Sequence, residues 1–380
     1  MNKLGIYIHI PFCKSKCKYC DFVSFSCSTE KMDRYFEYLI KEIENKEIKN
    51  IDDKIISTIY IGGGTPSFLE SKYIVKTLDV IKKRFKIEEN AEITIEINPG
   101  TITKQKLLDY KNVGINRISI GLQSTENRLL ELIGRIHNYD EFMNSYNLVK
   151  EVGFENINID LMLALPTQTN QELIDGLNKI IKLSPNHISI YSLIIEDNTP
   201  IQKLIENKVI ELPTEDIERK MYWNTKNILE KNGYNHYEIS NFAKKGYESK
   251  HNLDCWNQEE YLGFGLAAHS YYDNKRFSNI DNLEKYIENI KNNKIDKNIE
   301  LHEFQTRESK AKEFMMIGLR KLEGIKISEF EKKFRINPLF YFRFEIDKLV
   351  KAELLEVDLD YIRLTKKGLD LANQVFEEFI

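Results

Sequence analysis

Three cysteine side chains lie close together near the start of the chain, in the run CKSKCKYC. Closely spaced thiolates bind soft metals, and iron–sulfur clusters take cysteine sulfur as ligands. Cys13, Cys17 and Cys20 could ligate three irons of a four-iron cubane, which would leave the fourth iron open to a small molecule. A structural zinc ion normally takes four protein ligands. Cys27 or His9 could supply the fourth, so the spacing by itself leaves zinc as an alternative.

Six short apolar, β-branched segments are predicted as strands, and each ends in polar or glycine-rich residues. The predicted strands are 5–10, 56–61, 92–97, 117–122, 157–163 and 187–193. The residues that end or follow them include the cysteines, Gly62-Gly63-Gly64-Thr65-Pro66, Glu96, Asn98, Gln123, Asp160 and Ser192.

Helical patterns separate these strands, over residues 31–47, 71–85, 104–113, 140–152 and 170–183. Alternating strands and helices are typical of βα units around a parallel sheet. Barrels of such units keep their active sites at the carboxyl ends of the strands, where the polar residues gather here. Six units rather than eight predict an α/β fold, an open partial (β/α)6 TIM-like barrel.

The C-terminal part of the chain has a different pattern. Amphipathic helices are predicted over 310–322, 327–334 and 338–351, then a hairpin over 354–364 and a last helix over 366–379. This order resembles a small α+β winged-helix-like cap. We expect a barrel over 1–235, a connecting region over 236–303 and the cap over 304–380, with the Asn- and Lys-rich stretch 274–303 as the connection.

Composition excludes several classes of protein. The chain is 42% hydrophobic and 30% charged with a net charge of −4, which gives no reason to expect nucleic acid as a partner. No apolar run approaches the roughly 18 residues of a membrane span, and no signal-peptide core is visible, so we expect a cytoplasmic protein without stable membrane insertion. An odd number of cysteines argues against a disulfide framework.

Several motifs together resemble the radical S-adenosylmethionine (SAM) superfamily. They are GIYIHIPFC, CDF, IGGGTPS, EINPG, ISIGLQS, LIGRIHN and IDLMLALPTQT. They are most similar to the subgroup of oxygen-independent coproporphyrinogen III oxidases and HemW-type haem chaperones. The resemblance implies a [4Fe–4S] cluster on the three cysteines and SAM on the open iron, where a reduced cluster yields a 5′-deoxyadenosyl radical.

The same resemblance implies roles for individual residues. Tyr7 and Tyr19 would lie against the cluster and SAM, although a core aromatic is an equal alternative for Tyr7. Arg135 would hold a polar group of SAM, with a solvated helix residue as its alternative. The remaining SAM-binding residues implied are Gly63, Gly64, Thr65, Glu96, Gln123, Asp160 and, beside the adenine, Ile194.

Two departures favour the chaperone branch of the subgroup. The oxidases carry a further cysteine two residues after the third, where this chain has Phe22, and a longer segment before the cluster motif. Chaperone-type members carry an H-N-x-x-Y-W motif linked to haem. This chain matches it from His251 to Trp256, with Cys255 in place of tyrosine.

The resemblance therefore implies that His251 is a haem ligand. An imidazole suits iron, and Cys255 could also ligate haem iron. The alternative is that His251 and Trp256 are packed in a core. The stretch GFGLAAHSYY resembles a loop that closes the cofactor pocket from below, and a turn into a short strand is its alternative.

Two functions are consistent with these features. The first is a haem chaperone that binds haem, a [4Fe–4S] cluster and SAM, uses an electron donor and passes haem to an acceptor protein. The second is the coproporphyrinogen oxidase itself, a radical decarboxylase of porphyrin biosynthesis. A radical SAM enzyme with an unrelated substrate is a third possibility. Whether the chain is an enzyme stays open, and coproporphyrinogen oxidase activity is not expected.

Overall fold

A twelve-stranded sheet forms the centre of the computed structural model, which describes residues 2–380. The strand order is β12-β11-β10-β9-β1-β2-β3-β4-β5-β6-β8-β7. Strands β1 to β6 are parallel neighbours and confirm the six predicted strands. Their bounds are β1 Asn2–Ile10, β2 Lys54–Gly63, β3 Ile87–Ile97, β4 Arg117–Gln123, β5 Asn156–Leu163 and β6 His187–Ser192.

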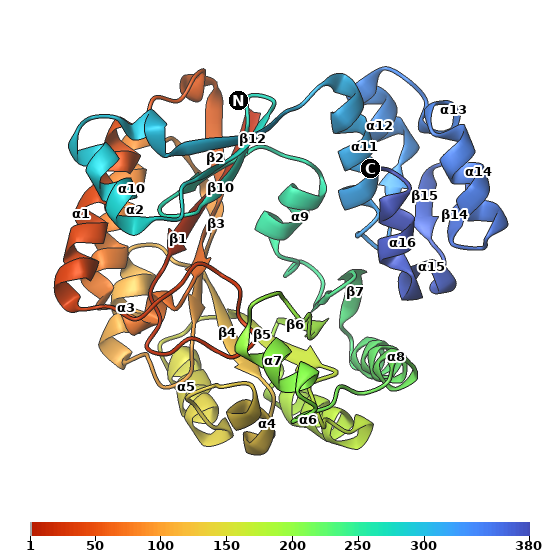
Figure 1. The fold of residues 1–380 in the computed structure, drawn as a ribbon, viewed down its shortest axis with the longest axis horizontal. Helices are drawn as coiled ribbons and strands as arrows, with labels where there is room; N and C mark the ends of the chain where they lie inside the picture. The colour runs from red at the N-terminus through yellow and green to blue at the C-terminus, as the bar shows by residue number, and fades with distance from the viewer. Residues whose placement is uncertain (1) are drawn as a thin grey trace.

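Helices cover the outer face of these strands, and α9 lies on the other side, between the sheet and the C-terminal helices (Figure 1). Side-chain oxygens cap several helix starts, among them Ser28, Thr103 and Asn138, and so satisfy backbone N–H groups of the first turn. The bounds are α1 Thr29–Asn45, α2 Ser71–Arg84, α3 Lys104–Asn112, α4 Asn127–Leu132, α5 Tyr139–Glu151, α6 Asn170–Leu183, α7 Pro200–Glu206, α8 Glu215–Lys231 and α9 Lys250–Trp256. The five predicted helices are confirmed, with ends that differ by a residue or two.

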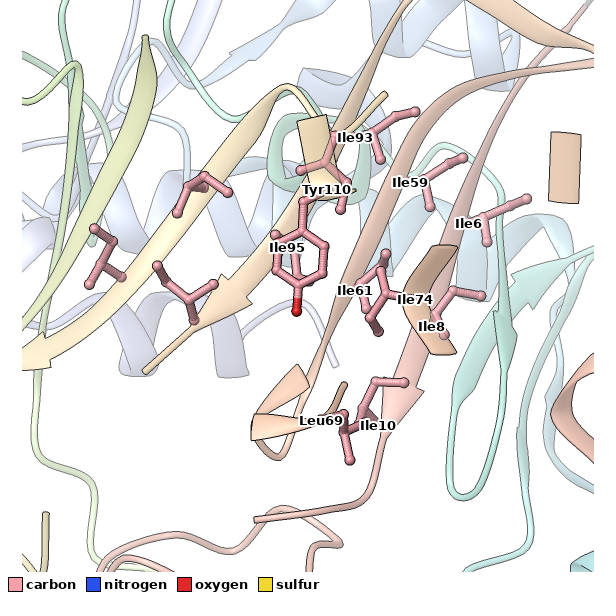
Figure 2. Packing of buried hydrophobic residues seen from close by; sticks show 14 of the residues in the cluster. Ile6, Ile8, Ile10, Ile59, Ile61, Leu69, Ile74, Ile93, Ile95 and Tyr110 are labelled. Atoms are coloured by element: carbon pink, nitrogen blue, oxygen red, sulfur yellow. The ribbon is translucent and has the colours of Figure 1, made fainter. Parts of the chain in front are cut away.

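The barrel core lies between the sheet and its outer helices (Figure 2). Ile6, Ile8 and Ile10 of β1 are completely buried and pack beside Ile59 and Ile95 of the neighbouring strands. Each such side chain stabilises the fold by about 1.5–3 kcal/mol on burial. Because successive side chains of a strand point to opposite faces, this isoleucine pattern turns the residues between them toward the barrel interior, called the lumen below.

Short strands extend the parallel sheet on both sides. Their bounds are β7 Asn235–Glu238, β8 Asn241–Ala243, β9 Tyr261–Phe264, β10 His269–Tyr272, β11 Lys275–Asn279 and β12 Ile299–Phe304. The stretch 274–303, expected to be a connection, is instead structured: it forms β11, β12 and helix α10 (Leu283–Lys291). The polar composition of this stretch gave no signal for these elements. Helix α10, for example, buries only one face, through Tyr286, Ile287 and Ile290.

The C-terminal cap has its own hydrophobic core, centred on Phe330 and Phe342. The predicted hairpin is confirmed, since β14 pairs with β15 antiparallel. The helices expected over 338–351 and 366–379 each break once, at Phe342 and Leu371, and Phe342 turns into the core there. The bounds are α11 Arg307–Gly318, β13 Ile325–Lys326, α12 Ile327–Phe334, α13 Pro338–Tyr341, α14 Arg343–Lys351, β14 Leu355–Val357, β15 Tyr361–Leu364, α15 Lys366–Asp370 and α16 Ala372–Glu377.

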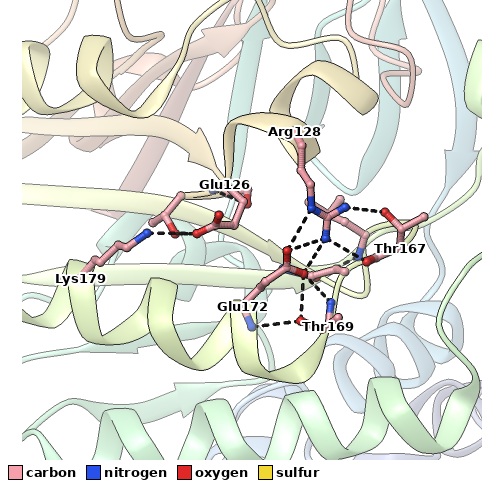
Figure 3. Close-up of polar contacts among 10 residues, drawn as sticks. Glu126, Arg128, Thr167, Thr169, Glu172 and Lys179 are labelled. Carbon is pink, nitrogen blue, oxygen red and sulfur yellow. Dashed lines mark hydrogen bonds and ion pairs between the residues drawn. The ribbon is translucent and has the colours of Figure 1, made fainter.

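An exposed ion pair fastens the loop after β5 to the helices around it (Figure 3). The Nε of Arg128 on α4 donates to Glu172 at 3.0 Å, and its Nη1 donates to the Thr167 hydroxyl at 2.8 Å. Glu172 also closes the capping box of α6 with Thr169. An exposed pair contributes at most about 1 kcal/mol, so its effect is mainly to orient this loop.

No helix among residues 2–380 is both long enough and apolar enough to cross a membrane.

Candidate functional site

A pocket of about 150 Å³ opens at the carboxyl ends of the parallel strands. It lies where the strand ends were expected to bring polar chemistry together. The predicted residues that line it are Cys13, Cys17, Tyr19, Cys20, Gly63, Gly64, Thr65, Glu96, Gln123, Arg135 and Asp160. Three predicted residues do not line it: Tyr7, Ile194 and His251.

The cysteines lie on a loop after β1 that is tied to the rest of the barrel by backbone hydrogen bonds. Cys13 N–H donates to the Phe25 carbonyl at 3.2 Å, and Lys18 N–H donates to the Ile133 carbonyl at 2.9 Å. All three thiols are free. Within residues 2–380, no three metal-ligating side chains are already close enough to hold a single ion. A cluster of four irons is larger than one ion and needs ligands spaced further apart.

The residues around the thiols suit a cluster with a bound anionic group. The Thr65 hydroxyl donates to Cys13 Sγ at 3.5 Å, and Arg135 Nη1 donates to Cys17 Sγ at 3.6 Å. Arg135 Nε is buried and has no partner among the described residues. Burial raises the pKa of Cys20 to about 11, so metal binding there has to release a proton. Three sulfur donors beside an incompletely paired guanidinium fit a [4Fe–4S] cluster with the carboxylate of SAM.

The small size of the glycines in this turn mainly lets other parts of the chain pack closely against it. A Cβ atom on Gly64 would lie 2.7 Å from the Phe12 carbonyl oxygen and 2.8 Å from that of Ile10. Gly63 has a φ of +106°, and the His9 ring occupies the space where its Cβ would be. These glycines therefore let the end of β2 approach the cysteine loop closely, and they leave the Gly63 amide free to donate to Glu96 Oε2 at 3.2 Å.

Two carboxylates face the pocket from strands β3 and β5. The Tyr60 hydroxyl donates to Glu96 Oε1 at 2.8 Å, and burial raises the pKa of Glu96 to about 7. The Ser119 hydroxyl donates to Asp160 Oδ2 at 3.0 Å, and burial also raises the pKa of Asp160. Such acceptors can hold the ammonium and hydroxyl groups of SAM.

Two further pocket residues were not among the predicted site residues. Asn98 accepts from Arg135 Nη2 at 2.9 Å and donates to the Thr65 hydroxyl at 3.1 Å. The Tyr191 hydroxyl donates to Gln123 Oε1 at 3.2 Å. Strand alternation could have found Tyr191, which is two residues beyond Ser189 on the same face of β6.

Tyr7 and Ile194 lie outside the pocket. Tyr7 points into the lumen, where its hydroxyl is hydrogen-bonded to His9 Nδ1 at 2.9 Å. His9 Nε2 in turn bonds the Val23 carbonyl of the cysteine loop at 2.9 Å, so Tyr7 reaches that loop through His9. Ile194 follows β6 and is 69% exposed.

His251 lies at the opposite end of the lumen, because α9 closes the amino-terminal end of the barrel. Its Nδ1 is 2.8 Å from the Thr58 hydroxyl, and its ring stacks on Tyr60 with centroids 5.3 Å apart. Burial lowers the pKa of His251 to about 4 and raises that of the Cys255 thiol to about 12. In this arrangement both side chains are neutral, and the His251 ring is enclosed by barrel residues.

Comparisons with known proteins agree with this geometry. The Radical SAM superfamily profile matches residues 7–180, and the HemN C-terminal domain profile matches residues 305–371. A protein of Lactococcus lactis named heme chaperone HemW is 38% identical over 98% of this chain and 96% of its own length. A HemW of Bacillus subtilis is 37% identical over 98% of each chain. The chain belongs to the HemW family.

HemW membership confirms the resemblance, and with it the radical SAM cofactors: a [4Fe–4S] cluster and SAM. The solved coproporphyrinogen III oxidase HemN of Escherichia coli matches the structure with a TM-score of 0.85 at 23% identity. That match covers 100% of this chain and 90% of HemN, which confirms the partial-barrel fold with a C-terminal cap.

Proposed function

We propose that this chain is a haem chaperone, which binds haem and delivers it to an acceptor protein in the cytoplasm. The observation that carries the proposal is its similarity, over nearly the full length, to several proteins named heme chaperone HemW. A [4Fe–4S] cluster and SAM support this role, and an electron donor reduces the cluster.

The proposal assigns a task to each part of the pocket. Cys13, Cys17 and Cys20 ligate the cluster, and Arg135 pairs with the carboxylate of SAM beside Cys17. Glu96 holds the ammonium group, while Gln123 and Asp160 hold hydroxyl groups. When bound, the cluster supplies one electron to cleave the carbon–sulfur bond of SAM. Tyr19 and the Gly63–Thr65 turn line the pocket between the [4Fe–4S] cluster and SAM.

The alternative function, coproporphyrinogen III oxidase, is supported by the fold that this chain shares with HemN. At 23% identity, that similarity supports the fold alone. Phe22 stands where those oxidases have their further cysteine, and it is 59% exposed at the pocket. A phenyl group cannot ligate a metal or transfer a proton. This difference favours the chaperone.

One preparation can test both functions. Anaerobically reconstituted protein should bind one haem per chain in a hemin titration and should form no protoporphyrinogen from coproporphyrinogen III with SAM and reductant. Robust turnover, with haem bound no more tightly than by an unrelated protein, would overturn the chaperone and leave the oxidase.

The role of His251 as a haem ligand is tested separately. His251→Ala should weaken haem binding or shift the haem absorption band, because an axial imidazole would be lost. Since His251 lies inside the barrel, ligation requires α9 to move away from Thr58 and Tyr60. His302→Ala is the matched control, because His302 lies on the edge strand β12, where its ring hydrogen-bonds Ser278 and stacks on His269. An unchanged band in His251→Ala would remove His251 from the ligand set.

A further inference from the structure

Arg117 is a fully buried cation in the barrel lumen that no sequence motif marked. It begins β4 and is 2% exposed, which makes it one of the largest buried side chains. Within residues 2–380, its buried Nε has no hydrogen-bond partner, and no carboxylate lies within ion-pair distance of its guanidinium. Burying a charge without a direct partner is costly, so the charge needs another explanation.

The neighbours of Arg117 at its own level cannot neutralise it. Arg117 is in register with Thr94 of β3 and Asn156 of β5, and Thr94 is in register with Tyr60 of β2. Thr94 Oγ1 and Asn156 Oδ1 are likewise buried and without partners among the described residues. This level of the lumen therefore offers uncharged groups only.

Carboxylates lie on both sides of this level. On the amino-terminal side, Glu92 of β3 is buried and accepts from the backbone amides of Lys250 and His251, at 3.2 and 3.1 Å. On the carboxyl-terminal side lie Glu96 and Asp160. Glu96 is in register with Ser119, and Asp160 is in register with Gly121, two and four residues beyond Arg117 along β4. The groups that hydrogen-bond these two carboxylates are neutral: Tyr60 and the Gly63 amide for Glu96, and Ser119 and Asn158 for Asp160.

The other nearby cation, Arg135, lies beside the cysteine loop, and in the proposed site it pairs with the carboxylate of SAM. The Arg135 guanidinium donates to Asn98, to the Gly121 carbonyl and to Cys17 Sγ. The titratable groups that face Glu96 from the remaining strands are Tyr7, Tyr60, Asp160 and Tyr191, and none of them is a cation. Arg117 is thus the positive charge beneath the carboxylate pair.

We propose that Arg117 is a positioning residue for SAM: an internal counter-ion that keeps Glu96 and Asp160 ionised so that they can hold the cofactor. The inference rests on the proposed cofactor site. Two carboxylates that share a buried space favour holding a proton between them, and a nearby charge acts strongly in a medium of low polarity even without direct contact. The pKa values support this direction, since Arg117 lowers the pKa of both carboxyl groups against the opposing effect of burial.

The test compares SAM binding by the cluster-loaded protein from pH 6 to 9 for wild type, Arg117→Gln and Arg117→Lys. Arg117→Gln should bind SAM about fivefold more weakly at pH 7, because raising the pKa of Glu96 from about 7 by about one unit lowers its ionised fraction from roughly one half to roughly one tenth. Binding should recover at pH 9, and Arg117→Lys should restore it at pH 7. Arg128→Met, which removes an exposed arginine of the nearby helix α4, should leave the whole profile unchanged.

Infrared titration of the cluster-free proteins provides a readout that needs no cofactor. The band of protonated carboxyl groups should persist to a higher pH in Arg117→Gln than in wild type. The proposal is overturned if the two bands titrate together, or if Arg117→Gln weakens SAM binding equally at every pH. Wild-type protein that binds no SAM would instead contradict the proposed cofactor site, while the infrared difference would still report on Arg117.

Discussion

At the residue scale, the pocket places three thiols, two carboxylates and one guanidinium around a space that a small charged molecule can fill. Neutral hydrogen-bond donors hold the carboxylates, and Arg135 is shared between Cys17 and Asn98. The site is therefore organised before any ligand binds, which reduces the entropy lost on binding.

The cysteine ligands give the most direct prediction. Replacing Cys13, Cys17 or Cys20 with alanine should abolish the iron and the visible absorption of anaerobically reconstituted protein, because each thiolate holds one iron. Cys27→Ala and Cys255→Ala are controls and should keep a full complement of iron. Stoichiometric zinc with no iron in the wild-type protein would contradict the cluster.

The raised pKa of Glu96 predicts how SAM binding depends on pH. Its pKa is raised to about 7, so the carboxylate form increases as pH rises from 6 to 8. An ammonium group binds the charged form, and SAM affinity should therefore rise over this interval. In Glu96→Gln the affinity should be low and should change little with pH, as measured by calorimetry. A wild-type affinity that is independent of pH would show that Glu96 does not bind the cation.

At the element scale, the end of β2 and the loop after β1 form one unit. The Gly64 amide donates to the Ile10 carbonyl at 2.7 Å, and the Thr65 amide donates to the Phe12 carbonyl at 2.8 Å. The glycine-rich turn thereby positions the cysteines as well as contacting the cofactor.

Gly64→Ala should consequently disturb the cluster loop. The new Cβ would meet backbone atoms of Ile10 and Phe12 that cannot rotate away. We expect a loss of about 1–3 kcal/mol in unfolding free energy, typical of overpacking, together with poorer cluster retention. Gly246→Ala is the control for cluster retention. Its φ of +87° disfavours alanine, so this variant should also lose stability, but a Cβ there contacts nothing within 4 Å and should leave the cluster loop intact. Full cluster occupancy and unchanged denaturant unfolding of Gly64→Ala would refute this coupling.

At the scale of the whole molecule, the barrel and the cap have separate hydrophobic cores joined by a few polar and aromatic contacts. Trp223 Nε1 of α8 donates to Asp370 at 2.8 Å, and the Arg320 guanidinium lies 4.5 Å from the Trp256 ring of α9. On this basis we propose a domain boundary between residues 303 and 304. The region 236–303, expected to be a connecting region, shares the sheet and the hydrophobic core of the barrel, so we propose that it forms one unit with residues 2–235.

Separate cores predict separate cooperative unfolding. Phe330→Ala should destabilise the cap by about 3–5 kcal/mol, because it removes a completely buried ring. Hydrogen exchange followed by mass spectrometry should show faster exchange in residues 305–380, with the barrel strands β1–β6 unchanged. Equal loss of protection in both parts would mean that the chain unfolds as one unit.

The sequence alone was sufficient for the features that depend on local pattern. Short apolar, β-branched runs identified the six parallel strands, and the helical patterns between them identified the five helices. Strand ends identified Glu96, Gln123 and Asp160 as pocket residues. The cysteine spacing with the glycine-rich turn indicated the family. These signals are local because side-chain direction follows backbone periodicity.

Only the tertiary structure decided the features that depend on what packs against what. The position of α9 buries His251 at the amino-terminal end of the barrel, and no local pattern distinguishes that placement from an exposed ligand. Strands β11 and β12 form in a polar stretch because they lie at the edge of the sheet, where β12 keeps most of its side chains exposed. In the sequence, nothing distinguishes Arg117 from other cations at the ends of strands. Its proposed role depends on strand register, which places it beneath two carboxylates contributed by other strands.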